Sequence, residues 1–145
     1  MKVSNFVSLW KLFNTTIFPR GEKAPSEYFS GGTAWVQIIK LNENQLNCQI
    51  GNVTFEPGCR NNWHSHAGGQ ILIVTAGTGF YQEKGKPVQV LHPGDVVTIL
   101  PEVIHWHGAA PDSGFTHIAI NPNTQNGMVE WLEPVPDEHY HNVSI

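Results

Sequence analysis

Charged side chains are scarce in this chain of 145 residues. Eight Lys and Arg and twelve Asp and Glu make up 14% of the sequence, against about one quarter in typical soluble domains. The formal net charge is −4 and no basic run occurs, which argues against a nucleic-acid partner. A chain with so few charges is expected to hide much of its surface, in a closed barrel or in an oligomer interface.

Cysteines and long apolar runs are also rare. Cys48 and Cys59 are too few for a disulfide scaffold and lack C-x-x-C spacing, so we expect reduced thiols in a cytoplasmic protein. No stretch approaches the roughly 18 apolar residues of a membrane span, so no membrane association is expected. No small-residue cleavage site follows residues 1–18, and a signal peptide is therefore not expected.

The sequence has no long amphipathic helix, and short β-branched or apolar stretches alternate with turns rich in Gly and Pro. This pattern predicts an all-β sandwich or barrel in a single domain, residues 1–145, with an extended N-terminal arm over about residues 1–32. The predicted strands are 33–39, 46–55 (interrupted at Gly51-Asn52), 62–66, 70–76, 79–82, 88–91, 96–100, 104–108, 115–120 and 129–132. Residues 136–140 are expected to form a helical turn capped by Asp137.

Histidines in strand-like segments are the most informative feature that is present. His64 and His66 are two residues apart, so both should face the same side of a strand. Gln70 follows a Gly-Gly turn and can face the same interior, as can His105 on a later strand. Imidazole and amide donors of this kind suit Mn, Fe, Ni or Zn. Because these donors are neutral, the ion keeps its full formal charge of 2+. We therefore predict a reactive metal site; the alternative is a metal-free ligand-binding barrel.

Two motifs in the same region resemble those of the cupin family. Gly58-x5-His64-x-His66-x3-Gln70-x6-Gly77 resembles the first cupin motif, with Gln where most cupins have Glu. Gly94-Asp95-x5-Pro101-x3-His105 resembles the second. The resemblance covers about residues 51–120 and implies a double-stranded β-helix, the jelly-roll-like cupin barrel. The metal ligands that it implies are His64, His66, Gln70 and His105.

The chain is similar in particular to bacterial cupin-type hydroxynitrile lyases, through segments such as His105-Trp106-His107-Gly108 and Thr116-His117-Ile118. This resemblance implies manganese as the most favoured metal, with Fe, Zn or Ni as alternatives, and a small-molecule substrate such as a mandelonitrile-type cyanohydrin. Because cupin barrels commonly pair and the arm has no core of its own, a homodimer or homotetramer is expected.

His107 and His117 are the candidate catalytic residues. A free imidazole titrates near neutral pH, so His107 could exchange a proton with the substrate, and His117 could hold the cyanide or share that proton. The structural alternatives are that His107 orients His105 and that His117 is a core histidine bonded to backbone. Two other functions remain open: a mononuclear metal dioxygenase of the cupin type, and a non-enzymatic module that binds a small ligand.

Overall fold

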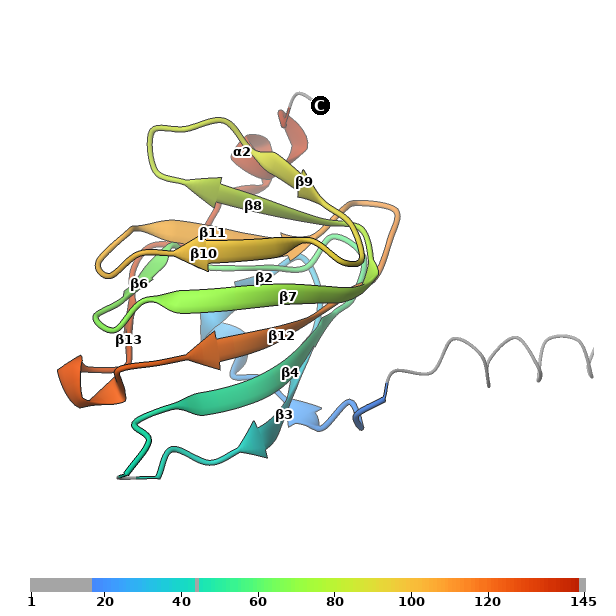
Figure 1. Cartoon of the computed structure of the whole chain (residues 1–145). Coiled ribbons are helices and arrows are strands. Elements are labelled where there is room, and N and C mark those ends of the chain that lie inside the picture. Colours follow the sequence, from blue (N-terminus) through green and yellow to red (C-terminus); the bar gives the residue numbers. More distant parts are fainter. Residues whose placement is uncertain (1–16, 44, 144–145) are drawn as a thin grey trace, which may run out of the picture.

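Two antiparallel sheets face one another and enclose the interior of the molecule (Figure 1). The computed structural model describes residues 17–43 and 45–143. The first sheet has six strands in the order β1-β3-β4-β12-β7-β10. They are β1 (Glu22–Lys23), β3 (Ala34–Lys40), β4 (Gln49–Phe55), β12 (Phe115–Asn121), β7 (Gln70–Gly77) and β10 (Val96–Ile99).

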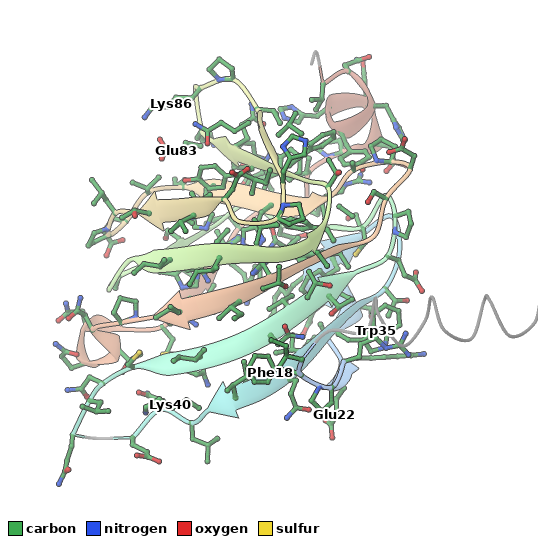
Figure 2. The ribbon with its side chains drawn as sticks, turned by 45° about the vertical axis from the view of Figure 1, so that its right-hand side comes forward. Phe18, Glu22, Trp35, Lys40, Glu83 and Lys86 are labelled. Carbon is green, nitrogen blue, oxygen red and sulfur yellow. The ribbon has the colours of Figure 1, made fainter. Side chains whose placement is uncertain are left out.

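The second sheet has the path β13-β6-β11-β5-β2, and β8 joins it by pairing with β11 and β9. Its strands are β2 (Phe29–Ser30), β5 (Arg60–Asn61), β6 (His64–His66), β8 (Gly79–Glu83), β9 (Gln89–Leu91), β11 (His105–Ala109) and β13 (Val129–Trp131). Glu83 and Lys86 form an ion pair of 2.6 Å at the hairpin between β8 and β9 (Figure 2).

The two antiparallel sheets confirm the predicted all-β jelly-roll-like barrel.

Alternating side chains place the core between the sheets. Along β7, Leu72 and Val74 are buried, whereas Ile71 and Ile73, which alternate with them, are only partly covered. Successive strand residues point to opposite faces, so one set fills the barrel and the other lies on its outside. The inward set joins Phe55 and other buried residues in the larger hydrophobic cluster.

A second, smaller cluster lies beneath the C-terminal segment. Helix α2 (Asp137–His141) contributes Tyr140, which packs with Trp106 and Phe80, both of them buried. The guanidinium of Arg60 lies 4.6 Å from the Tyr140 ring centroid and anchors this segment to the barrel. Two short 3-10 helices complete the elements, η1 (Ser26–Tyr28) and η2 (Thr124–Asn126).

The expected cap of the C-terminal helix is wrong. The N-cap residue of α2 is Pro136, and no side chain caps the helix. Asp137 lies inside the first turn, where its Oδ1 atom accepts a hydrogen bond from Nη2 of Arg60 at 2.5 Å. The carboxylate therefore ties the helix to β5 instead of satisfying the helix's own backbone.

Strand β4 also differs from the prediction, because it runs through Gly51-Asn52 without interruption. Both of its neighbours, β3 and β12, pair with it at these residues. Part of the expected arm is likewise built into the sheets, since β1 pairs with β3 and β2 with β5. The remainder of the arm, residues 1–16, lies outside the described residues.

Both cysteines are free thiols, as expected. Cys59 is buried in the core, and this burial raises the pKa of its thiol to about 12. None of the helices in the described part of the chain has the length and apolar character that a membrane crossing requires.

Candidate metal centre and cavity

Three imidazoles converge at the centre of the second sheet. His64 and His66 project from the same face of β6, and His105 on β11 lies directly opposite His64. One ring nitrogen from each can be chosen so that all three lie within 4.8 Å of one another. The structure thus brings together three of the four predicted ligands on adjacent strands.

Backbone carbonyls set the tautomers of two of these rings. Nδ1 of His64 donates to the carbonyl oxygen of Asn62 at 2.8 Å, and Nδ1 of His105 donates to that of Val103 at 2.9 Å. With the proton on Nδ1, the lone pair lies on Nε2, the atom free to bind a metal. Nε2 of His66 is buried and has no hydrogen-bond partner. These donors fit a divalent ion.

Burial keeps the three imidazoles neutral. The pKa of His64 is held well below its usual value of 6.5, first by burial and then by neighbouring His105. Burial also lowers the pKa values of His66 and His105 to about 4. Because only a neutral imidazole can bind a metal, the site is ready for one at neutral pH.

Gln70, the fourth predicted ligand, begins β7 and reaches the same point from the first sheet. Its Nε2 donates to Oδ1 of Asn121 at 3.0 Å, and its Oε1 lies 3.4 Å from Nε2 of His105. The amide therefore presents its oxygen, the atom that can bind a cation, toward the histidines.

The two candidate catalytic histidines form a pair beside the ligand group. Nε2 of His117 lies 3.2 Å from Nδ1 of His107, a distance at which one ring donates to the other. Asn61 holds His107 in place: its Oδ1 accepts from the His107 backbone N–H at 2.9 Å, and its Nδ2 lies 3.3 Å from the ring nitrogens. The His107 ring also stacks on that of His105, with centroids 5.8 Å apart.

The expectation that His107 titrates near neutral pH is wrong. Its side chain is almost completely buried, and burial holds its pKa well below 6.5, with further lowering from His117 and His64. Burial lowers the pKa of His117 to about 4. Both rings are thus neutral at physiological pH, so the pair can accept a proton but binds it weakly.

A cavity of about 180 Å³ opens onto both histidine groups. Its apolar wall includes Phe29, Val53 and Trp131, and its polar lining includes Asn61, Gln70 and the histidines other than His105. No Asp or Glu is among the described residues that line it. The cavity is smaller than most drug-binding pockets, and its lining suits a small, mostly apolar molecule with one polar end.

Sequence reasoning missed three residues that shape this site: Asn61, Asn121 and Trp131. Trp131 on β13 lies opposite His64, with ring centroids 4.8 Å apart, and it stacks on Tyr28 at 4.6 Å. Strand parity alone could have flagged Asn121, because it shares the face of His117 and Ala119. No local signal marked the other two, since their positions depend on which strands pair.

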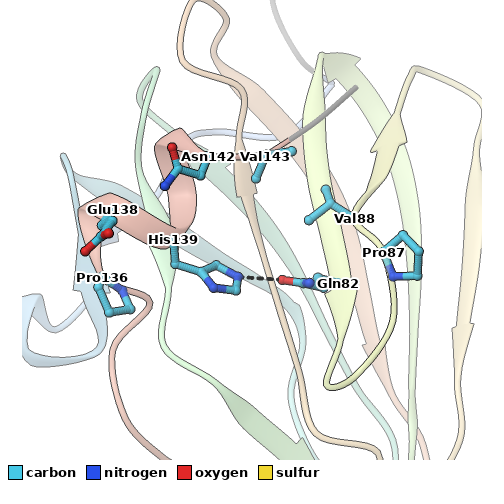
Figure 3. A pocket seen from close by; sticks show the side chains of 8 residues that line it. All are labelled: Gln82, Pro87, Val88, Pro136, Glu138, His139, Asn142 and Val143. Carbon is cyan, nitrogen blue, oxygen red and sulfur yellow. Dashed lines mark hydrogen bonds between the residues drawn. The ribbon is translucent and has the colours of Figure 1, made fainter.

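A larger but more open hollow, of about 540 Å³, lies between α2 and the β8–β9 hairpin (Figure 3). At its wall, Oε1 of Gln82 accepts hydrogen bonds from Nε2 of His139 and Nε1 of Trp106, both at 2.8 Å. It contains none of the predicted ligand or catalytic residues. The predicted ligands and catalytic candidates therefore lie at the smaller cavity and not at this hollow.

Known proteins are similar to this chain in sequence and in fold. Residues 51–121 match the family model described as "Cupin domain". An (R)-mandelonitrile lyase from Granulicella tundricola is 44% identical over 118 residues, which cover 81% of this chain and 89% of the relative.

Two solved structures show the same similarity at the level of the fold. A cupin-like protein from Thermotoga maritima superimposes with a TM-score of 0.86 at 51% identity, covering 90% of this chain and 98% of that one. The DMSP lyase DddQ from Ruegeria pomeroyi shares the fold, with a TM-score of 0.61 at 15% identity over 92% of this chain and 68% of that one. High identity over most of both chains, together with the two motifs and the barrel, shows that this chain belongs to the cupin family.

Proposed function

We propose that this cupin is a metal-dependent lyase that cleaves or forms the C–C bond of a small cyanohydrin of the mandelonitrile type. The observation that carries the proposal is the placement of three neutral imidazoles beside a mostly apolar cavity that also holds a hydrogen-bonded histidine pair. The relative named as an (R)-mandelonitrile lyase, at 44% identity, supports the substrate class.

The residues that would hold the metal are His64, His66, Gln70 and His105. We propose Mn²⁺, in keeping with the mixed nitrogen and oxygen donors and the absence of thiolates among them. When bound, a divalent ion in this neutral donor set would supply Lewis acidity that favours loss of a proton from a substrate hydroxyl.

Cyanohydrin cleavage moves one proton and breaks one C–C bond. The hydroxyl group loses its proton, the C–O bond becomes a carbonyl, and the electron pair of the broken bond leaves with the cyanide carbon. The hydrogen-bonded pair of His107 and His117 can accept the hydroxyl proton and return it to the departing cyanide. Because burial weakens the basicity of both rings, the proton is returned readily rather than kept.

The cavity positions the substrate for these transfers. Its polar lining of histidines and amides would receive the hydroxyl and nitrile groups. Its apolar wall, with Trp131 and Phe29, would receive the hydrocarbon part by burying it from water. Aromatic or branched small cyanohydrins are thus the expected substrates.

The first experiment loads the metal-free protein with Mn²⁺ and measures release of benzaldehyde and cyanide from mandelonitrile at mildly acid pH. Parallel samples loaded with Fe²⁺, Zn²⁺ or Ni²⁺ test the choice of metal. His105→Ala should lose both metal and activity. His117→Phe should keep the metal and lose at least about 100-fold in rate, the contribution typical of a positioned proton-transfer group.

A matched control is His92→Ala, because the His92 side chain is 64% exposed and lies outside the cavity. It should keep both metal and activity. If His105→Ala releases cyanide at the same rate as the wild type, the proposal is wrong. Oxygen consumption by the Fe²⁺-loaded protein, without cyanide release from any metal form, would instead favour a dioxygenase.

A further inference from the structure

We infer that Met128 determines the size of the molecules that the cavity beside the histidines accepts, because its side chain narrows the mouth of that cavity. This size limit rests on the proposed function in one respect, that the cavity holds a small organic molecule. Met128 lies in the connection between β12 and β13 and outside both sequence motifs. It is nevertheless one of the residues that line the cavity.

The exposure of the lining residues locates the mouth of the cavity. The closed end lies at the histidine pair, where His107 is 4% exposed and His117 is 0% exposed. Among the described residues that line the cavity, the most exposed are Met128 at 40%, Val129 at 38% and Ile38 at 37%. The cavity therefore reaches solvent between β3, which carries Ile38, and the residues at the start of β13.

The two sides of the mouth belong to different sheets. Ile38 is on β3 in the six-stranded sheet, whereas Met128 leads into β13 at the edge of the other sheet. The connections β3–β4 and β12–β13 lie at the same end of the barrel (Figure 1). The three most exposed lining side chains are all apolar, and no Asp, Glu, Lys or Arg is among the described residues that line the cavity. A molecule that enters must therefore be uncharged or nearly so, and it must fit between Ile38 and Met128.

A hydrogen bond and close packing fix the segment that carries Met128. On one side, the backbone N–H of Thr124 donates to the carbonyl oxygen of Asn47, in the β3–β4 connection, at 3.0 Å. On the other side, the segment lies so close to Gly68 that an added Cβ atom there would clash with the carbonyl oxygen of Pro122. Because the backbone is held on both sides, the width of the mouth depends on the side chain at position 128.

Met128 can be changed without disturbing the proposed metal ligands. Val129 lies directly opposite His66 in the ladder between β13 and β6, whereas Met128 precedes that ladder. A methionine side chain is unbranched and flexible, so it fills the space that a well-fitting ligand leaves at the mouth. Truncation to alanine removes that filling and leaves the histidines as they are.

The volume of the cavity indicates which molecules meet Met128. Apolar cavities of about 150 Å³ in other proteins hold one benzene molecule, and the cavity here measures about 180 Å³. A molecule with one aromatic ring and a short polar group therefore fits inside. A molecule with two fused rings extends through the mouth, where the Met128 side chain stands in its way.

Binding of two neutral alcohols to the full chain, loaded with diamagnetic Zn²⁺, tests this size limit without any turnover. Benzyl alcohol has one ring and 2-naphthylmethanol has two, and NMR shifts of the backbone amides on β4 and β12 report their binding in the cavity. The wild type should bind the naphthyl alcohol at least about 10-fold more weakly, an effect typical of a group that does not fit its pocket. Met128→Ala should bind both alcohols with similar Kd values, and Met128→Trp should weaken both by about 10-fold or more. Ile38→Ala, on the other side of the mouth, should act in the same direction as Met128→Ala.

Two controls should keep the wild-type preference. Met128→Leu retains most of the bulk at the mouth, and Leu100→Ala removes an apolar side chain from a residue that is 65% exposed and lies outside the cavity lining. A Met128→Ala variant that keeps the wild-type ratio of the two Kd values would overturn the inference, as would a wild type that binds both alcohols equally or binds neither. Failure of the proposed function is seen separately. If these binding shifts occur but no metal form releases cyanide from mandelonitrile, the size limit at Met128 stands and the lyase proposal is wrong.

Discussion

Nε2 of Gln70 donates a hydrogen bond to Oδ1 of Asn121 at 3.0 Å, and this single contact decides which end of the Gln70 amide faces the histidines. Reversal of the amide would point two N–H donors, which cannot bind a cation, at the site. Asn121 comes from β12, so the first sheet supplies both the oxygen donor and the group that orients it. The three imidazoles come from the other sheet.

Replacing Asn121 by Leu should therefore weaken metal binding about 10-fold or more, the usual effect of losing a residue that orients a ligand. Asn121→Asp keeps an acceptor for Nε2 of Gln70 and should bind at least as well as the wild type. Competition titration with Mn²⁺ and a chromophoric chelator measures both. Equal affinity in the Leu and Asp variants would contradict this role for Asn121.

Gly51 lines the cavity on β4, and there is room beside it for a side chain. A Cβ atom added there would meet its nearest neighbours, the carbonyl oxygen of Gln37 and Cγ1 of Val36, at 3.7 Å, which is ordinary van der Waals contact. Gly51→Val should thus fold and bind metal normally while taking up part of the 180 Å³ cavity. We expect KM for mandelonitrile to rise more than KM for a small aliphatic cyanohydrin. A rise in KM by the same factor for both substrates would show that Gly51 does not determine which substrate size the cavity accepts.

Acidification should destabilise the metal-free protein through its buried histidines. The pKa of His117 is about 4 in the folded chain and near 6.5 when unfolded, so between these pH values the unfolded state binds more protons. Stability from this residue is complete above pH 6.5 and is lost as the pH falls toward 4, with a change on the order of 3 kcal/mol. Urea unfolding from pH 7 to pH 4 should show this slope, and His117→Phe should reduce it. An unchanged slope in the variant would show that other groups dominate.

Arg60 and Asp137 should contribute unequally to stability although they form one ion pair. Arg60 is 2% exposed and donates from Nε and Nη2 to the carbonyl oxygen of Val135, whereas the Asp137 side chain is 79% exposed. Arg60→Met leaves that carbonyl unpaired and should lower the free energy of unfolding by about 2–3 kcal/mol. Asp137→Ala should cost much less, because solvent screens the charge of its exposed carboxylate. Urea titrations at pH 7 compare the two, and similar losses would mean that the ion pair itself anchors α2.

Strand periodicity predicted the fold and the shared face of the clustered histidines well, because both depend on local rules. The parity of His64 and His66 follows from the two-residue repeat of a strand, whatever the strand packs against. The same rule places His107 with His105. The environment of His107 could not be predicted this way, since it depends on which strands bring Phe55, 52 residues earlier, and His117 against its ring.

The failures have the same physical origin. Gly51-Asn52 looked like a break because glycine and asparagine disfavour strands locally, yet ladders on both sides of β4 override that preference. Asp137 is a good N-cap residue in isolation, but Arg60, far away in sequence, binds it instead. In each case a long-range partner outweighs a local propensity.

The protons on His64 and His105 are held by main-chain carbonyls, those of Asn62 and Val103. A substitution at either of these positions changes a side chain and leaves its carbonyl in place. The tautomers of these two proposed metal ligands therefore do not depend on which side chains stand at positions 62 and 103, whereas a side chain such as Val53 lines the cavity and sets its shape. Changes that reshape the cavity can thus alter which molecule fits while the ring nitrogens that face the proposed metal keep their protonation.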